Sequence, residues 1–106
     1  MKYEVVLTGE AERNLHAAYQ WYDSRSAEAA RRWYDGIVRA MASLEQSPER
    51  CPLARENERF PVQLRQLNYG SGKRLTHRIL FVIRPWRVVV YAIRHLAQRD
   101  VLPEDF

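Results

Sequence analysis

Hydrophobic and polar side chains alternate at the start of the chain and then recur with a helical period. Residues 2–7 alternate, which is typical of a short strand with one buried face. Thr8 is suited to cap a first helix, because Glu10 and Glu12 follow in the first turn, where the helix dipole favours acids. An apolar stripe at spacings of three and four residues continues this helix through Ala11, Leu15, Ala18 and Tyr22.

A second helix follows after a break at residues 23–26. Ser26 is suited to cap it, and its apolar stripe is wider than that of the first helix. Gly36 weakens a helix by about 1 kcal/mol relative to alanine, so its presence indicates close packing against the first helix. Pro48 ends the second helix, and the short linker makes the two helices antiparallel.

The second half of the chain changes from helical to extended patterns. Residues 48–61 contain three prolines among charged side chains and predict an ordered surface loop. Residues 79–83 and 88–93 are apolar at every position, so these segments are expected in the centre of a sheet with both faces covered. The strands predicted in this half cover residues 62–69, 75–83 and 88–95.

The predicted order of elements is therefore β-α-α-β-β-β. This order indicates an α+β fold in which an N-terminal strand precedes an antiparallel helical hairpin packed on a small, mainly antiparallel sheet. A chain of 106 residues suffices for one domain, so residues 1–106 are expected to form a single unit. We expect the helices to cover one face of the sheet and to leave the other partly open.

Composition narrows the class of protein further. Apolar residues make up 46% and charged residues 28% of the chain, which excludes a disordered protein. The longest apolar runs are far shorter than the roughly 20 residues of a membrane span, and no signal peptide follows Met1. The single cysteine, Cys51, excludes an internal disulfide and a cysteine-based zinc site. These features predict a cytoplasmic protein without membrane association, metal or cofactor.

Charge is distributed unevenly along the chain. The formal net charge is +4, and no Asp or Glu occurs from Arg59 through Arg99. Such a segment builds a positive field unless acidic side chains from elsewhere in the chain cover it after folding.

Two arginines, Arg78 and Arg94, lie on predicted central strands among hydrophobic residues. Arginine in such a place is costly unless it is paired or faces a wet cleft. Two interpretations follow: an ion pair to an acid of the helices, or a guanidinium cluster that binds phosphate or carboxylate and that Arg65 could join. A three-residue turn between the strands places Arg78 opposite Arg94, whereas a two-residue turn at residues 85–86 places it opposite Ile93.

His95 ends the last predicted strand. It could act as a general base or acid in RNA cleavage, although a strand-end histidine bonded to the backbone is the more ordinary role. His77 is expected at the end of the neighbouring strand. No pair of acids stands near the basic strands, and no spacing of His, Asp and Glu suggests a metal site.

Two further features carry candidate binding residues. The Gly70–Lys73 segment fails as a phosphate loop, because the required first glycine and the Ser or Thr after the lysine are missing. It therefore predicts a hairpin turn in which Lys73 and Arg74 can contact phosphate as plain charges. Among the many aromatic residues of the helices, Trp21 and Tyr34 lie off the apolar stripes, so one or both are expected at the surface as a docking site for a partner.

Three groups of residues together resemble the RelE/ParE toxin superfamily, and they cover nearly the whole chain. The first is YEVVLT leading into EAERNL over residues 3–15. The second is SAEAARR at the start of the second helix and SPER at its end. The third is HRILFVI, then VVVYAIRH, then the pair Arg99 and Asp100.

This resemblance implies the toxin of a bacterial type II toxin–antitoxin pair that a cognate antitoxin neutralises. RelE-like members cleave mRNA on the ribosome, whereas ParE-like members inhibit DNA gyrase by protein binding. The chain has no lysine cluster in the 48–61 loop and no His or Tyr in its last five residues, which favours the ParE-like branch. The resemblance implies catalytic roles, in the RelE-like alternative only, for Arg65, Arg78, Arg94 and His95. Residues expected to bind the target or the antitoxin are Lys73, Arg74, Arg78, Arg94, Arg99, Trp21 and Tyr34.

Overall fold

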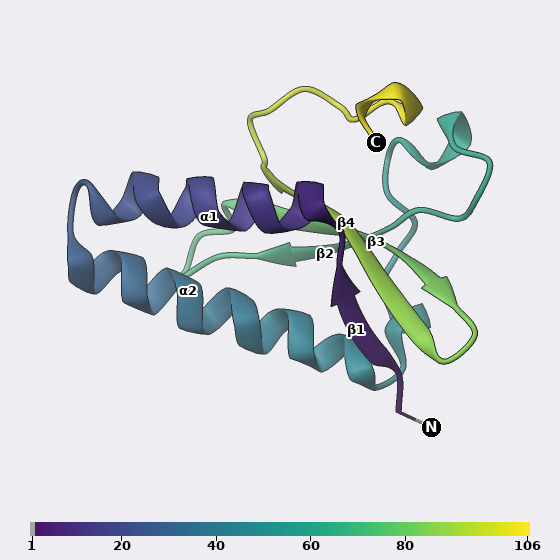
Figure 1. Ribbon diagram of the computed structural model, residues 1–106, viewed down its shortest axis with the longest axis horizontal. Coiled ribbons are helices and arrows are strands. Elements are labelled where there is room, and N and C mark those ends of the chain that lie inside the picture. The colour runs from purple at the N-terminus through teal and green to yellow at the C-terminus, as the bar shows by residue number, and fades with distance from the viewer. Residues whose placement is uncertain (1) are drawn as a thin grey trace.

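Two long antiparallel helices and a four-stranded sheet form the frame of the protein (Figure 1). The computed structural model describes residues 2–106. The order of elements is the β-α-α-β-β-β order predicted from the sequence, and the α+β class is confirmed. The elements are β1 (Glu4–Leu7), α1 (Gly9–Asp23), α2 (Ala27–Ala42), β2 (Arg65–Tyr69), β3 (His77–Arg84) and β4 (Arg87–His95).

Both helices begin at the caps that the sequence predicts. The hydroxyl of Thr8 accepts a hydrogen bond from the backbone N–H of Ala11 at 3.1 Å, and that of Ser26 accepts one from Ala29 at 3.1 Å. These contacts satisfy backbone donors that a helix start otherwise leaves free. The three-residue connection between Asp23 and Ala27 returns α2 alongside α1 (Figure 1).

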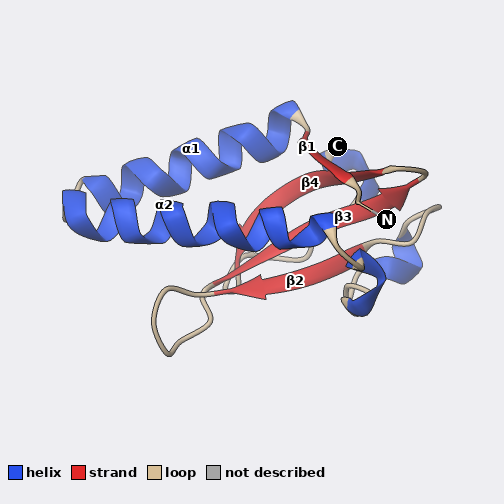
Figure 2. Cartoon of the chain, turned by 90° about the horizontal axis from the view of Figure 1, so that it is seen from below, coloured by secondary structure: helices blue, strands red, loops and turns tan. Residues whose placement is uncertain are grey.

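The strands lie in the order β1-β4-β3-β2. β1 runs parallel to β4, and the other two pairings are antiparallel, so the apolar strands β3 and β4 are central as predicted. Both helices pack on one face of the sheet (Figure 2). The large core on this face includes Trp33, Ile37, Leu44, Phe81, Val88 and Val90.

The register of the central hairpin combines features of both sequence-based alternatives. Its loop has two residues, since Arg84 pairs with Arg87. A bulge at Tyr91 then shifts the pairing by one residue, so that Arg78 lies opposite Arg94 after all. A two-residue turn alone would have placed Ile93 in that position.

The second face of the sheet is covered, so the expectation that it is partly open is wrong. Ala54 and Leu64 of residues 51–64, called the covering loop below, pack on this face together with Val101 of the segment after β4. The covering loop is closed by a hydrogen bond from the N–H of Ala54 to the carbonyl of Leu64 at 2.8 Å. Residues 62–64, predicted as strand, belong to this loop and not to β2. The small second core comprises Ala54, Leu64, Leu80, Val82, Ala92 and Val101.

Gly36 marks a close contact, but with the sheet and not with α1. A methyl group at this position would overlap the hydroxyl of Tyr69 in β2 and lie 2.9 Å from the ring carbon Cζ. The Tyr69 hydroxyl in turn donates a hydrogen bond to the carbonyl of Trp33 at 3.0 Å. The glycine therefore lets β2 approach α2 closely.

We predict that Gly36→Ala destabilises the protein by about 1–2 kcal/mol, although alanine is the better helix former, because Tyr69 must give up its hydrogen bond. Urea unfolding measures the change. In a Tyr69→Ala background the same substitution should instead stabilise the protein by about 0.5–1 kcal/mol. A stabilised Gly36→Ala single variant would contradict this account.

Candidate functional site

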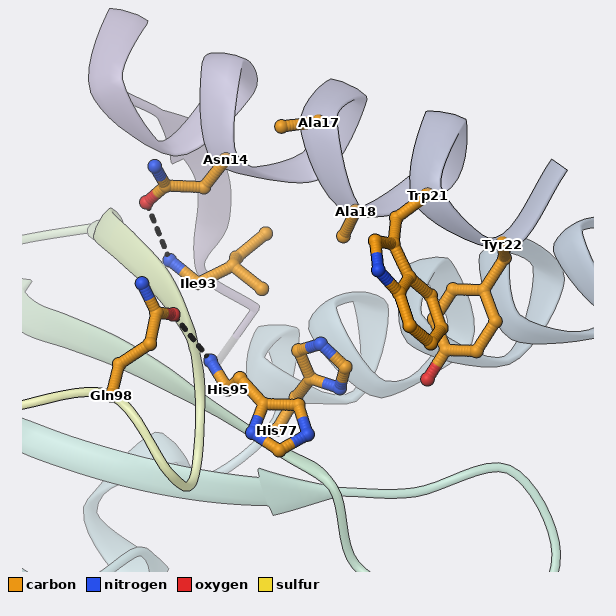
Figure 3. Close-up of a pocket in the computed structure, with 9 residues that line it drawn as sticks. All are labelled: Asn14, Ala17, Ala18, Trp21, Tyr22, His77, Ile93, His95 and Gln98. Atoms are coloured by element: carbon orange, nitrogen blue, oxygen red, sulfur yellow. Dashed lines mark hydrogen bonds between the residues drawn. The ribbon is translucent and has the colours of Figure 1, made fainter. Parts of the chain in front are cut away.

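A cavity of about 490 Å³ opens between α1 and the ends of β3 and β4 (Figure 3). Its α1 wall is formed by small and aromatic side chains, and the strands contribute two histidines. Beyond Val90 the edge of β4 next to the cavity has no strand among residues 2–106 paired with it, and two side-chain amides bind its backbone instead. Asn14 accepts a hydrogen bond from the N–H of Ile93 at 3.0 Å, and Gln98 accepts one from the N–H of His95 at 2.8 Å. The lining residues are Asn14, Ala17, Ala18, Trp21, Tyr22, His77, Ile93, His95 and Gln98.

The two histidines are neighbours with their ring centroids 5.2 Å apart. The indole N–H of Trp33 donates to Nδ1 of His77 at 3.4 Å, and the backbone N–H of Ala97 donates to Nδ1 of His95 at 3.0 Å. Because both donors can only donate, each neutral ring carries its proton on Nε2. Burial, and then the neighbouring His95, lower the pKa of His77 to about 4. His77 is therefore uncharged at neutral pH.

Exposed aromatic residues surround this region of the helices. Trp21 at the rim of the cavity is 54% exposed, and the guanidinium carbon of Arg25 lies 3.7 Å from the centre of its ring. Tyr34 is 40% exposed and lines a separate hollow with Tyr19. The predicted exposure of Trp21 and Tyr34 is confirmed, and their role in binding remains a prediction.

The second face of the sheet carries a buried ion pair between Arg78 of β3 and Glu56 of the covering loop, and both side chains are fully buried. The guanidinium donates from Nη1 to one carboxylate oxygen at 2.7 Å and from Nη2 to the other. Gln66 accepts a second bond from Nη1 at 3.1 Å, and the N–H of Val101 donates to Glu56 at 2.9 Å. The pair thus joins β2, β3, the covering loop and the C-terminal segment.

The charges of this pair stabilise one another. Burial raises the pKa of the Glu56 carboxyl, but the hydrogen bonds from Arg78 and Val101 and the nearby positive charge outweigh this, so the pKa lies below its ordinary value. The Nε of Arg78 and the Nε of Arg94 are buried without a hydrogen-bond partner among residues 2–106. Arg78 is nevertheless paired with an acid, as one of the two sequence-based interpretations predicts. That acid comes from the covering loop and not from the helices.

Arg94 lies beside Arg78 and is held by the C-terminal segment. Its Nη2 donates to the carbonyl of Arg99 at 2.6 Å, and the Arg99 guanidinium forms two bonds of 2.9 and 3.0 Å to Asp105. Burial, and then the charges of Arg99 and Arg78, lower the pKa of Arg94. Hydrogen bonds from Arg99 and from the N–H of Leu102 lower the pKa of Asp105 to about 2.

The structure does not bring the predicted catalytic residues together. Arg65 pairs with Phe81 and therefore points to the helix face, where it donates to the carbonyl of Cys51 at 2.7 Å. Arg78 and Arg94 point to the opposite face, and His95 lies at the cavity on the helix side. The prediction of one accessible guanidinium cluster is wrong, because side chains alternate along strands and the register places Arg65 out of phase.

The prediction that Arg78 contacts the target or the antitoxin at the surface is also wrong, because its side chain is fully buried. Lys73 and Arg74 are exposed in the connection between β2 and β3, where Gly72 has a φ of 90°. Their contacts with a partner remain predictions, as do those of Arg94 and Arg99.

Residues 2–106 contain no group of three His, Cys, Asp or Glu side chains close enough to hold a metal ion. Neither α1 nor α2 has the length and apolar character needed to span a bilayer, nor does any other helix in this range.

Comparison with known proteins decides the family. The profile of the ParE toxin of the type II toxin–antitoxin system parDE matches residues 5–99. The chain belongs to the ParE toxin family. A comparison with curated proteins found no match.

Two solved structures share the fold of this ParE-family chain. A structure titled as the chromosomal ParDE toxin–antitoxin system of P. aeruginosa aligns with a TM-score of 0.69 at 21% identity, over 89% of this chain and 96% of that chain. The toxin–antitoxin complex RelBE2 of Mycobacterium tuberculosis aligns with a TM-score of 0.53 at 24% identity, over 92% and 95%. At these identities the likeness shows the fold alone.

The residue pattern predicts neither the buried role of Glu56 nor the cavity. Glu56 lies among several charged residues of the covering loop, and nothing in its sequence distinguishes it from the exposed Glu58. The cavity depends on how α1 lies across the uncovered edge of β4, which the residue pattern does not encode. A weak signal existed for the cavity, because Ala17 and Ala18 place two small residues beside the off-stripe Trp21.

We predict that Glu56→Gln destabilises the ParE-family protein by about 3 kcal/mol or more at pH 7, because Arg78 is left as a buried charge without its partner. The folded-state pKa of Glu56 lies below the ordinary 4.5, so the pair stabilises above that pH and this contribution is lost as the pH falls below it. The difference between wild type and variant in urea unfolding should therefore shrink towards pH 3.

The exposed Glu58 provides the matched control, since Glu58→Gln changes the same charge in the same loop. This control should differ little from wild type. Equal losses for both variants would show that the buried pair contributes no specific stability.

Proposed function

We propose that the chain is the toxin of a type II toxin–antitoxin pair and that it inhibits DNA gyrase by binding it, without cleaving RNA. Membership of the ParE toxin family supports this proposal. The observation that supports the absence of RNA cleavage is the separation of the strand arginines. Arg78 is neutralised by its ion pair with Glu56, and Arg65 points to the other face of the sheet.

This separation argues against the ribonuclease alternative on electrostatic grounds. Cleavage by the 2′-hydroxyl of RNA develops negative charge on a pentacovalent phosphate, and cations must converge on that phosphate to stabilise it. A guanidinium already neutralised inside the protein adds nothing to such a site. His95 lies on the helix side of the sheet and Arg94 on the other, so they do not flank one phosphate.

The antitoxin is proposed to bind the helix side of the molecule. Trp21 and Tyr34 expose aromatic surface there, and the cavity beside Trp21 has an interior lined largely by apolar side chains. Aromatic residues next to a concave pocket are typical of protein interfaces. An apolar side chain of an antitoxin helix suits this cavity.

We predict that the purified protein stops DNA supercoiling by gyrase and leaves mRNA on translating ribosomes intact. The supercoiling reaction is followed on agarose gels, and 5′ ends are mapped in a translation extract that contains the same protein concentration. Cuts in the ribosomal A site, with supercoiling unaffected, would establish the ribonuclease in place of the proposed function.

We predict that Trp21→Ala weakens antitoxin binding by about 10- to 100-fold, because the side chain forms the exposed rim of the cavity. Binding to the cognate antitoxin is measured by titration calorimetry. Gln20→Ala changes an exposed neighbour on α1 outside the cavity and should bind like wild type. Unchanged affinity in Trp21→Ala would place the antitoxin elsewhere.

A further inference from the structure

The turn between β3 and β4 holds a tryptophan in a backbone conformation that bulky residues avoid. Trp86 has a φ of 65°, in the left-handed region that favours glycine. Its side chain is 66% exposed, more than any other large hydrophobic side chain within residues 2–106. A strained backbone is thus combined here with an indole that lies in solvent.

The neighbouring proline explains why the strain falls on this residue. Arg84 pairs with Arg87, so the loop consists of Pro85 and Trp86 alone. The usual two-residue hairpin turns need a positive φ at the first of these positions, and the ring of proline forbids it. Trp86 instead carries the positive φ at the second position, as in a type II turn, where glycine or asparagine normally stands.

Packing within the protein does not account for the tryptophan. Within residues 2–106 its side chain is 66% exposed and belongs to neither of the two hydrophobic core clusters. Only its backbone is held, since its carbonyl accepts a hydrogen bond from the N–H of Glu4 at 2.9 Å. A residue that strains the backbone and contributes little to the core is typical of a functional contact.

We infer that Trp86 is the anchor with which the toxin contacts its target, inserting the indole into an apolar pocket with an acidic rim on the gyrase protein. The inference rests on the proposed function, because it assigns the surface that touches gyrase. Exposed Arg84 and Arg87 flank the indole, and Trp and Arg are enriched at the energetic centres of protein interfaces. Their positive charge complements an acidic rim.

The charges at the turn favour a protein over a nucleic acid as the occupant. Arg87 donates to the carboxylate of Glu4 at 3.1 Å, which leaves Arg84 as the flanking cation without an ion pair among residues 2–106. Nucleic acids are bound through several phosphate contacts at once, so one such cation supplies little affinity. An indole beside one or two guanidinium groups suffices for a pocket on a protein.

The turn is also presented rigidly and away from the helical side. β1 runs beside the start of β4 and holds the Trp86 carbonyl through Glu4, so little order has to be gained on binding. In Figure 1 the β3–β4 turn lies at one end of the molecule, and the connection between α1 and α2 lies at the other. The anchor is therefore separate from the proposed antitoxin cavity.

The variant Trp86→Gly tests the inference, because glycine accepts the positive φ without strain. We expect its Tm to stay unchanged or to rise by about 2–5 °C. Its gyrase inhibition should fall by about tenfold or more in the supercoiling assay, with antitoxin affinity unchanged. Trp86→Phe keeps an aromatic ring on the strained backbone and should retain part of the inhibition.

Other outcomes overturn the inference in distinguishable ways. Inhibition by wild type and Trp86→Gly at the same concentration overturns it and leaves the proposed function standing. Absence of inhibition by wild type overturns both. A lowered Tm together with weakened antitoxin binding assigns Trp86 a structural role. A parallel loss of binding to bare duplex DNA, measured without gyrase, assigns the contact to nucleic acid.

Discussion

The buried pair of Arg78 and Glu56 is the interaction on which the arrangement of the rest depends. It links β3 to the covering loop and, through the N–H of Val101, to the C-terminal segment. Two segments far apart in sequence are thereby held over the second face of the sheet. An uncompensated charge at this depth would be costly, so the loop, the strand and the C-terminal segment must assemble together. The same pair removes Arg78 from any contact with a partner.

Much of the fold could be predicted because local patterns and topology agree. The caps at Thr8 and Ser26, the helical stripes and the apolar central strands each specify an element without tertiary information. The covered second face could not be predicted, because it depends on how the proline-containing covering loop folds back on the sheet. Choosing Glu56 over Glu58 as the partner of Arg78 likewise requires knowing which side of that loop meets the strand.

The candidate site was harder to predict than the fold because it depends on register. A single extra residue, Tyr91, decides whether Arg78 lies opposite Arg94 or Ile93. The face occupied by Arg65 follows from its pairing with Phe81, which no local pattern reveals. The long basic segment consequently does not form one positive surface: its side chains divide between two faces, and acids that flank it in sequence, Glu56 and Asp105 among them, neutralise part of its charge.

The two proposed surfaces lie at opposite ends of the β3–β4 ladder, and their separation sets the length of a partner that covers both. His77 and His95 mark the cavity end, and Arg84 and Arg87 mark the turn. Eight residues of strand span roughly 23 Å at about 3.3 Å per residue. One antitoxin side chain in the cavity leaves the β3–β4 turn exposed. An antitoxin segment that covers both the cavity and the turn must span this distance, which is the length of a helix of about 16 residues. A shorter antitoxin segment bound at the cavity would leave Trp86 exposed, so it would not block the proposed anchor by covering it.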